Sequence, residues 1–243
     1  MTTLVVGASG ATGKELVRHL LDQGQNVKVI VRSIEKVPDT WKNLDDLCIL
    51  EGSLLDIPKK EIEEYVKGCD AIASCLGHNL SFKGIYGKPR KLVRDSVQLL
   101  CNAVEVNRAE KPVKFVLMNT TGNRNKDLNE KISLGEKLVL GIIRVLLPPQ
   151  SDNEQAAEFL RTGIGQNNTF VEWVTVRPDS LFNEDDISKY SLHPSPIRSA
   201  IFNAGKTSRT NVGHFMASLI TNNELWEEWK GQMPVIYNEE VKK

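Results

Sequence analysis

Three glycines near the start of the chain are spaced so that the backbone could approach a phosphate closely. Residues 7–13 read Gly-Ala-Ser-Gly-Ala-Thr-Gly and lie between the apolar run 4–6 and a helical pattern that continues to residue 21. A strand, a glycine turn and a helix together present free N–H groups and the positive end of a helix dipole to an anion. The spacing is not Gly-x-Gly-x-x-Gly, so the prediction depends on this context. We predict a dinucleotide site at Gly7, Ser9, Gly10, Ala11, Thr12 and Gly13; the alternative is a turn that binds nothing.

The residue after the second strand-like run favours a cofactor that carries a 2′-phosphate. Folds that bind NAD place an Asp or Glu near the end of this strand, where it bonds the ribose 2′-hydroxyl. Here the run 27–31 is followed by Arg32 and Ser33. A guanidinium can hold a phosphate through two hydrogen bonds, whereas a carboxylate would repel it. We therefore predict NADP(H), with Arg32 at the 2′-phosphate and Ser33 among the cofactor contacts; the alternative for Arg32 is an exposed loop arginine.

Two further strand ends supply candidate cofactor contacts. We expect Asp56, just past the third strand, to accept a hydrogen bond from the adenine amino group, to cap the following helix, or both. Small residues after the fourth strand would leave room for the cofactor, and Cys75 is interpreted as a packing residue rather than a redox thiol. The predicted contacts at these two ends are Ser53, Leu54, Asp56, Cys75, Leu76 and Gly77.

Strand-like and helix-like segments alternate along the chain. The predicted strands are 3–6, 27–31, 47–50, 70–75, 113–118, 170–176 and 234–237, and the predicted helices are 14–23, 59–67, 90–108, 132–147, 153–162 and 211–220. This alternation predicts an α/β fold with a doubly wound, mostly parallel sheet and helices on both faces. We expect a single domain over residues 1–243, in which residues 178–243 form a small substrate-side portion.

The segment 138–147 is apolar nearly all round. Such a helix is typically buried on several sides, so we predict that it packs in the core. The alternative is contact with a partner protein or a membrane surface.

Composition excludes several classes of function. The 243 residues contain 31 Lys and Arg against 31 Asp and Glu, so net charge does not favour nucleic acid or an anionic membrane as partner. The start of the chain lacks a secretory pattern, and the longest apolar stretch is too short to span a bilayer. Four cysteines without metal-ligand spacing indicate reduced thiols in a cytoplasmic protein and no metal site.

With these residues in place, the chain resembles the atypical short-chain dehydrogenases/reductases. The nearest groups are the NmrA-like proteins and the flavin reductase (biliverdin reductase B) type. The resemblance covers nearly the whole chain and implies a Rossmann fold that binds NAD(P), but it does not fix a substrate. Its motifs are residues 7–13, Val-Arg-Ser at 31–33, Gly-Ser-Leu-Leu-Asp at 52–56, Val-Leu-Met-Asn-Thr-Thr-Gly at 116–122, Leu-Pro-Pro at 147–149 and Val-Arg-Pro-Asp-Ser-Leu at 176–181.

The chain departs from the family at its usual proton donor. Ordinary members carry Tyr-x-x-x-Lys, in which the lysine lowers the pKa of the tyrosine. None of Tyr65, Tyr86, Tyr190 and Tyr237 has a lysine four residues later. An epimerase or dehydratase also needs that tyrosine and is disfavoured. Two interpretations remain: an NADPH-dependent reductase of a flavin, quinone, tetrapyrrole or small carbonyl, or an NmrA-like NADP(H) sensor that acts through a protein partner. A subunit of a larger assembly is a further alternative.

The reductase interpretation assigns roles by resemblance. Thr121 matches the hydroxyl that assists catalysis after the fifth strand in the flavin reductase relatives, with solvent as the source of the proton. Asn119, Thr120 and Pro178 join the cofactor contacts. His78, Tyr86 and Asp179 are assigned to the substrate pocket. The alternatives are that residues 119–121 only satisfy backbone groups and that His78 is a polar surface residue.

Overall fold

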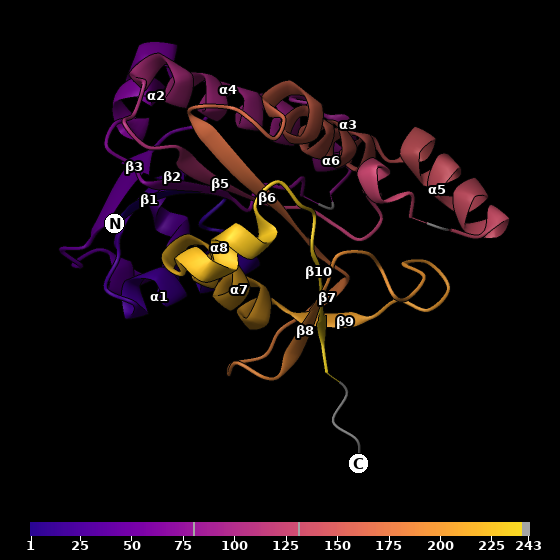
Figure 1. The fold of residues 1–243 in the computed structure, drawn as a ribbon. Helices are drawn as coiled ribbons and strands as arrows, with labels where there is room; N and C mark the ends of the chain where they lie inside the picture. The colour runs from indigo at the N-terminus through magenta and orange to yellow at the C-terminus, as the bar shows by residue number, and fades with distance from the viewer. Residues whose placement is uncertain (80, 131, 240–243) are drawn as a thin grey trace.

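The computed structural model describes residues 1–79, 81–130 and 132–239 and shows an eight-stranded sheet (Figure 1). Its strands are parallel except for the last, which runs antiparallel to its neighbour. The predicted doubly wound, mostly parallel fold is confirmed. In spatial order the strands are β3 (Leu47–Glu51), β2 (Asn26–Val31), β1 (Thr2–Val6), β4 (Ala71–Ser74), β5 (Val113–Met118), β6 (Val171–Pro178), β10 (Val235–Asn238) and β8 (Tyr190–His193). A separate pair joins β7 (Ser180–Phe182) and β9 (Lys206–Ser208).

Helices cover both faces of the sheet. One face carries α1 (Ala11–Asp22), α7 (Arg209–Thr221) and α8 (Asn223–Trp229), and the other carries α2 (Lys59–Val66), α4 (Leu92–Asn107) and α6 (Pro148–Glu158). Two further helices, α3 (Phe82–Tyr86) and α5 (Leu134–Leu146), lie at one end of this second layer, and α5 projects from the body (Figure 1). Shorter turns are η1 (Ile34–Lys36), η2 (Asp39–Trp41), η3 (Lys126–Leu128) and the π-helical η4 (Phe159–Ile164).

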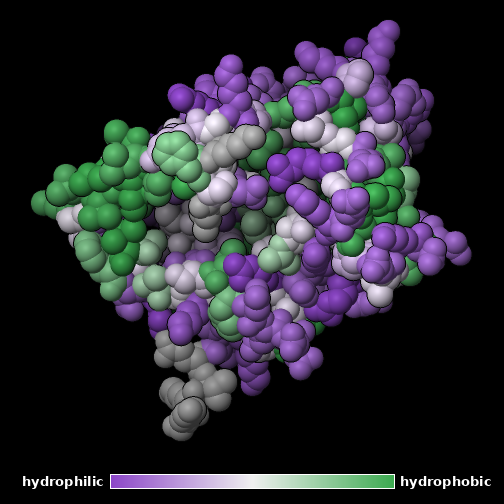
Figure 2. Space-filling view, turned by 180° about the vertical axis from the view of Figure 1, so that it is seen from behind, coloured by the Kyte–Doolittle hydropathy of each residue, from purple (hydrophilic) through white to green (hydrophobic). Residues whose placement is uncertain are grey.

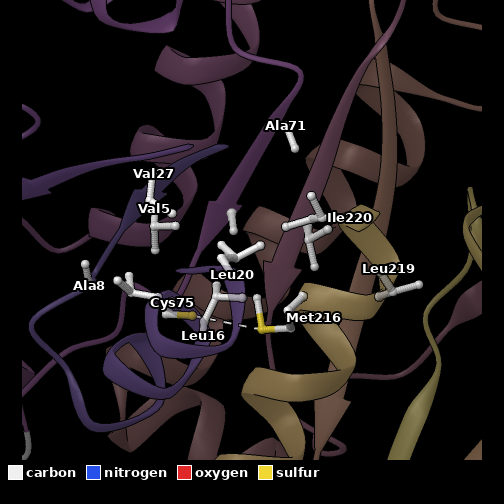
Figure 3. Close-up of a cluster of buried hydrophobic side chains, with 14 of the residues drawn as sticks. Val5, Ala8, Leu16, Leu20, Val27, Ala71, Cys75, Met216, Leu219 and Ile220 are labelled. Atoms are coloured by element: carbon white, nitrogen blue, oxygen red, sulfur yellow. Dashed lines mark hydrogen bonds between the residues drawn. The ribbon is translucent and has the colours of Figure 1, made fainter. Parts of the chain in front are cut away.

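The central strand β1 shows why these sequences form a sheet covered on both sides. Leu4 and Val6 are buried with the helices of one layer, whereas Val5 is buried with Leu16 of α1 and Met216 of α7 (Figure 3). Successive side chains of a strand point to opposite faces, so a strand covered on both faces is apolar throughout. Each such side chain contributes roughly 1.5–3 kcal/mol when fully buried.

The prediction that segment 138–147 packs in the core is wrong. Of the apolar side chains along the described helix α5, Leu140 alone is buried, while Leu134 and Val145 are exposed by 83% and 81%. The helix lies beyond the end of the sheet, where no second layer covers its outer face.

Other predicted boundaries also shift. The helix expected from residue 153 begins at Pro148, because proline is tolerated in a first helical turn. The short elements α3, β7, β8, β9 and α8 were not predicted, since segments of three to seven residues show little periodicity.

The contact between α1 and α7 contains a histidine pair, of which His19 is buried and His214 is half-buried. A Cβ on Gly213 would lie 2.8 Å from the backbone of Glu15, so glycine lets the helices approach. Beside it, the rings of His19 and His214 meet edge to face with centroids 5.4 Å apart, and the Tyr190 hydroxyl lies 2.9 Å from Nδ1 of His214. Burial lowers the pKa of both histidines below the ordinary value of 6.5.

We predict that this pair makes the fold sensitive to acid. Because both pKa values are lower in the folded state, the unfolded chain binds more protons near pH 6.5. The stabilisation is therefore complete above that pH and is lost as the pH falls through it. Thermal unfolding followed by circular dichroism between about pH 7.5 and 5.5 should show a falling Tm, with a shallower slope in His214→Gln. Parallel slopes in the two proteins would contradict the prediction.

Candidate active site

The glycine turn lies at the point where the strand order reverses. Val6 of β1 pairs with β2 on one side and with β4 on the other, and Gly7 follows it with a φ of 75°. A Cβ on Gly7 would lie 2.5 Å from the carbonyl carbon of Cys75, at the end of β4. A Cβ on Gly13 would overlap the carbonyl oxygen of Gly7. These two glycines are therefore required by the local packing itself.

Gly10 has a different environment. It is the N-cap of α1 in an extended conformation, and a Cβ there would meet the Gly7 oxygen at 3.2 Å. No side chain caps the first turn of α1, and this turn contains no acidic residue. The amides at Ala11 and Thr12 and the positive end of the helix dipole therefore point to the crevice at the strand ends. Such a terminus suits an anion such as a pyrophosphate.

The end of β2 presents a free cation beside this terminus. Arg32 is exposed, and it has no hydrogen-bond or ion-pair partner within residues 1–79, 81–130 and 132–239. Ser33 accepts a hydrogen bond from the Glu35 amide at 3.3 Å and caps η1, which fixes the turn that carries the arginine. The guanidinium can therefore reach a ligand without breaking an existing ion pair.

The expectation that Asp56 caps the next helix is wrong. The N-cap of α2 is Pro58, and no side chain bonds the first amides of that helix. Instead, the Ser53 carbonyl accepts from the Asp56 and Ile57 amides, and this turn carries the chain past the site where the cap would form. The Asp56 side chain is exposed and Leu54 is buried. A contact of Asp56 with adenine stays a prediction.

Cys75 is a packing residue. Its Sγ lies 4.0 Å from Sδ of Met216 in the core beneath the glycine turn (Figure 3). Burial raises the pKa of this thiol to about 12, which disfavours the reactive thiolate. The next two residues leave the core: Leu76 is half-buried, and Gly77 is exposed with no atom within 4 Å of its Cβ position.

The structure brings Thr121 and Asp179 together at the carboxyl ends of β5 and β6. The Thr121 amide donates to the Pro178 carbonyl at 3.1 Å, and its hydroxyl bonds the Asp179 carboxylate. That carboxylate also accepts from the Gly205 amide at 2.8 Å. Burial raises the pKa of Asp179, although these two donors oppose the shift. A half-buried carboxyl that holds a proton more tightly than usual therefore lies next to the predicted catalytic hydroxyl.

Asn119 and Thr120 satisfy backbone groups. The Asn119 amide nitrogen donates to the Asn153 carbonyl at 2.9 Å, and its oxygen accepts from the Thr120 amide. The Thr120 hydroxyl accepts from the Gly122 amide. The alternative given for residues 119–121, that they satisfy backbone groups, thus describes these two side chains. Their contacts with the cofactor remain predictions.

His78 is neither a surface residue nor an open pocket residue. Its side chain is 4% exposed, with Nε2 2.7 Å from Asp152 and Nδ1 3.1 Å from the Gly84 carbonyl oxygen. Asp152 also accepts from the amides of Val93 and Arg94, which lie in the first turn of α4. The pair therefore joins the loop after β4 to α4 and α6. No periodicity connects residues 74 positions apart, so the sequence did not reveal it.

Tyr86 forms its hydrogen bond with α5 and not with Thr121. Its hydroxyl donates to the Leu146 carbonyl at the end of α5, at 3.0 Å, and its ring contacts Phe82. Its predicted place in the substrate pocket stays a prediction.

The sequence interpretation missed a buried ion pair beneath the site. Arg177 and Glu130 are both buried, with Nη2 and Oε1 2.7 Å apart. An arginine inside the apolar run of β6, directly before Pro178, was the available signal. Above this pair, a cavity of about 310 Å³ lies between α5 and the loop 195–200, with Thr121 among its lining residues.

The fold and the site together define a dinucleotide-binding α/β protein. A sequence model described as NAD(P)H-binding matches residues 7–223, so the chain belongs to the NAD(P)H-binding family. This result confirms the resemblance found in the sequence. Along the described ranges, no helix combines the length and the apolar character needed to cross a bilayer.

Curated relatives match only part of this chain. A segment of 78 residues is 33% identical to an uncharacterized chloroplastic protein of Arabidopsis thaliana, over 32% of this chain and 28% of that protein. A segment of 85 residues is 35% identical to N-acetyl-gamma-glutamyl-phosphate reductase of Pectobacterium carotovorum, over 33% of this chain and 25% of that enzyme. The matches thus span about a quarter of each relative.

Solved structures share the fold over the whole chain. A short-chain dehydrogenase/reductase of Veillonella parvula in complex with NADP superposes with a TM-score of 0.70 at 12% identity, over 100% of this chain and 96% of that one. The anaerobillin reductase ChuY of Escherichia coli O157:H7 gives 0.69 at 14%, over 100% of both chains. The oxidoreductase ylbE of Lactococcus lactis gives 0.69 at 16%, over 99% and 92%.

The glycines of the turn give a matched set of variants. We predict that Gly10→Val keeps the fold but weakens NAD(P)H binding by more than about tenfold, because its side chain would occupy the approach to the α1 terminus. Gly13→Val should instead lower the Tm, because its Cβ overlaps the turn. Fluorescence titration and thermal unfolding measure the two effects. A folded Gly10→Val protein with wild-type affinity would show that the turn binds nothing.

Proposed function

We propose that the protein is a reductase that uses NADPH. The observation that carries the preference for NADP(H) is the unpaired Arg32, next to the uncapped terminus of α1 on the adjacent strand. A 2′-phosphate would gain two hydrogen bonds from the guanidinium, and the neighbouring Glu51 carboxylate is engaged by the Ile34 amide at 3.2 Å. The NADP complex of the Veillonella parvula relative is consistent with this preference.

Bound NADPH would supply a hydride to the acceptor. Thr121 would orient the acceptor through its hydroxyl, and Asp179 would hold the proton that completes the reduction. Two features support these roles: the hydrogen bond between the two side chains, and the raised pKa of the half-buried carboxyl. An acid that keeps its proton closer to neutral pH is a better general acid than an ordinary aspartate.

The proposed acceptor is a flavin, quinone, tetrapyrrole or small carbonyl. The cavity beside Thr121 and the loop 195–200 support the assignment of residues 178–243 to the substrate side. The name of the Escherichia coli relative, an anaerobillin reductase, is consistent with a reductase. The buried, free thiols Cys69, Cys75 and Cys101 support a cytoplasmic location.

Arg32→Glu tests the cofactor preference. We expect the wild type to bind NADPH more tightly than NADH, and the variant to lose on the order of 1.5–3 kcal/mol toward NADPH. The affinity for NADH should change much less, because NADH has no 2′-phosphate. Calorimetric titration of both cofactors with both proteins measures the difference. Equal wild-type affinities would remove the basis of the preference.

Thr121→Val tests the catalytic role. An acceptor screen with NADPH comes first, using flavins, quinones, tetrapyrroles and small carbonyls. With the acceptor found, the variant should lower kcat roughly ten- to a hundredfold and leave NADPH affinity unchanged, because the lost bond acts in the transition state.

Thr175→Val is the matched control. Thr175 lies in β6, and its buried hydroxyl has no partner among the described residues, so the same change there should leave turnover intact. If every acceptor remains unreduced while NADPH binds tightly, the reductase assignment fails and the NmrA-like sensor takes its place.

A further inference from the structure

The outer side of α5 is an apolar surface. Leu134, Leu138, Ile142, Val145 and Leu146 follow one another at intervals of four, four, three and one residues, which places them on one side of the helix. All five are exposed. We call this set the α5 face. Figure 2 shows hydrophobic side chains gathered at the left end of the molecule, where α5 projects.

Two neighbouring segments extend the α5 face. Phe82 of α3 is 80% exposed, and Tyr86 of the same helix donates to the Leu146 carbonyl. On the other side, the exposed ring of Phe202 lies 3.7 Å from the Cβ position of Gly135, within the first turn of α5. Three segments that are distant in sequence thus share one apolar surface. Soluble monomers rarely expose a contiguous apolar patch of this kind.

The charges beside the α5 face are predominantly positive. Residues 71–94 contain five Lys or Arg and no Asp or Glu, although the whole chain has no net charge; one of the five, Arg94, pairs with Asp95 at 2.8 Å. Lys88, Arg90 and Lys91 follow α3 directly and are exposed, and none has an ion-pair partner in the part of the chain that the structure describes. On α5 itself, Lys137 is exposed and the acidic Glu136 is buried.

We propose that the α5 face docks on a bilayer that contains anionic lipids. A helix that lies in the plane of the interface buries its apolar side at the boundary of headgroups and acyl chains, and its basic neighbours contact anionic headgroups. The α5 face and the cations after α3 have this arrangement. A second copy of the chain fits less well, because two such surfaces would bring like charges together.

Docking would also place the candidate active site close to the lipid surface. The cavity beside Thr121 is lined by Ile132, Ser133 and Glu136 at the start of α5, and its opposite wall includes Ile197. Ile197 is exposed, as is Leu134 at the same end of the helix. The cavity would therefore open near the lipid surface. The docking itself does not depend on the proposed reductase activity.

Vesicle co-sedimentation tests the docking. Purified full-length protein is mixed with vesicles of phosphatidylcholine alone or of phosphatidylcholine with phosphatidylglycerol. We expect binding to the anionic vesicles that weakens at high salt. The double variant Leu138→Gln/Val145→Gln should lower the partition coefficient by at least about tenfold, and Lys88→Gln/Lys91→Gln should weaken binding to the anionic vesicles only.

Val106→Gln is the matched control. Val106 is 60% exposed on α4, outside the α5 face, so this variant should bind as the wild type does. Circular dichroism confirms that each variant is folded. Absence of wild-type binding to anionic vesicles would overturn the proposal, as would unchanged binding by the α5 double variant. If light scattering instead shows a dimer that the same double variant dissociates, without vesicle binding, the surface is a self-association interface.

Discussion

The five N–H groups of a single guanidinium hold together the part of the candidate active site around Thr121 and Asp179. Inside the core, Arg177 donates to the carbonyls of Met233, Asn123 and Pro194 and to both carboxylate oxygens of Glu130. A buried charge is costly unless every donor has a partner, and here every donor has one. Met233 precedes β10 and Pro194 follows β8. Asn123 and Glu130 lie between β5 and α5. The arginine therefore joins three connections: the one from β5 to α5, the one before β10 and the one after β8.

This constraint explains why chemically useful groups meet above it. Thr121 belongs to the loop that Asn123 anchors, and Asp179 follows the arginine by two residues, so their hydrogen bond is set by the same buried pair. The cavity between α5 and the loop 195–200 begins at Glu130. At the other end of the crevice, the glycine turn is shaped by backbone packing. Gly7 and Gly13 have no Cβ, and the turn has no room for one at either position.

The sequence predicted what local patterns determine. Apolar runs between segments of helical periodicity identified the strands from β1 to β6. It could not predict contacts made across the chain. For His78 the sequence offered a place in the substrate pocket or, as the alternative, at the surface, and it did not reveal the partner Asp152, which is far away in sequence. For Asp56 it left a helix cap open beside an adenine contact, because a turn at Ser53 cannot be foreseen from composition. The apolar character of α5 was read correctly, but its position beyond the sheet follows from tertiary structure only.

The isolation of α5 has a consequence for how such a protein can diversify. Leu140 and Glu136 are its buried side chains, so most substitutions along the helix leave both cores of the sheet untouched. Ser133 caps the start of the helix, and Pro148 begins the next helix soon after its end. Mutation can thus change its outer surface without a loss of folding stability. In evolutionary terms, α5 is a segment where new surface properties can arise while the cofactor site stays constant.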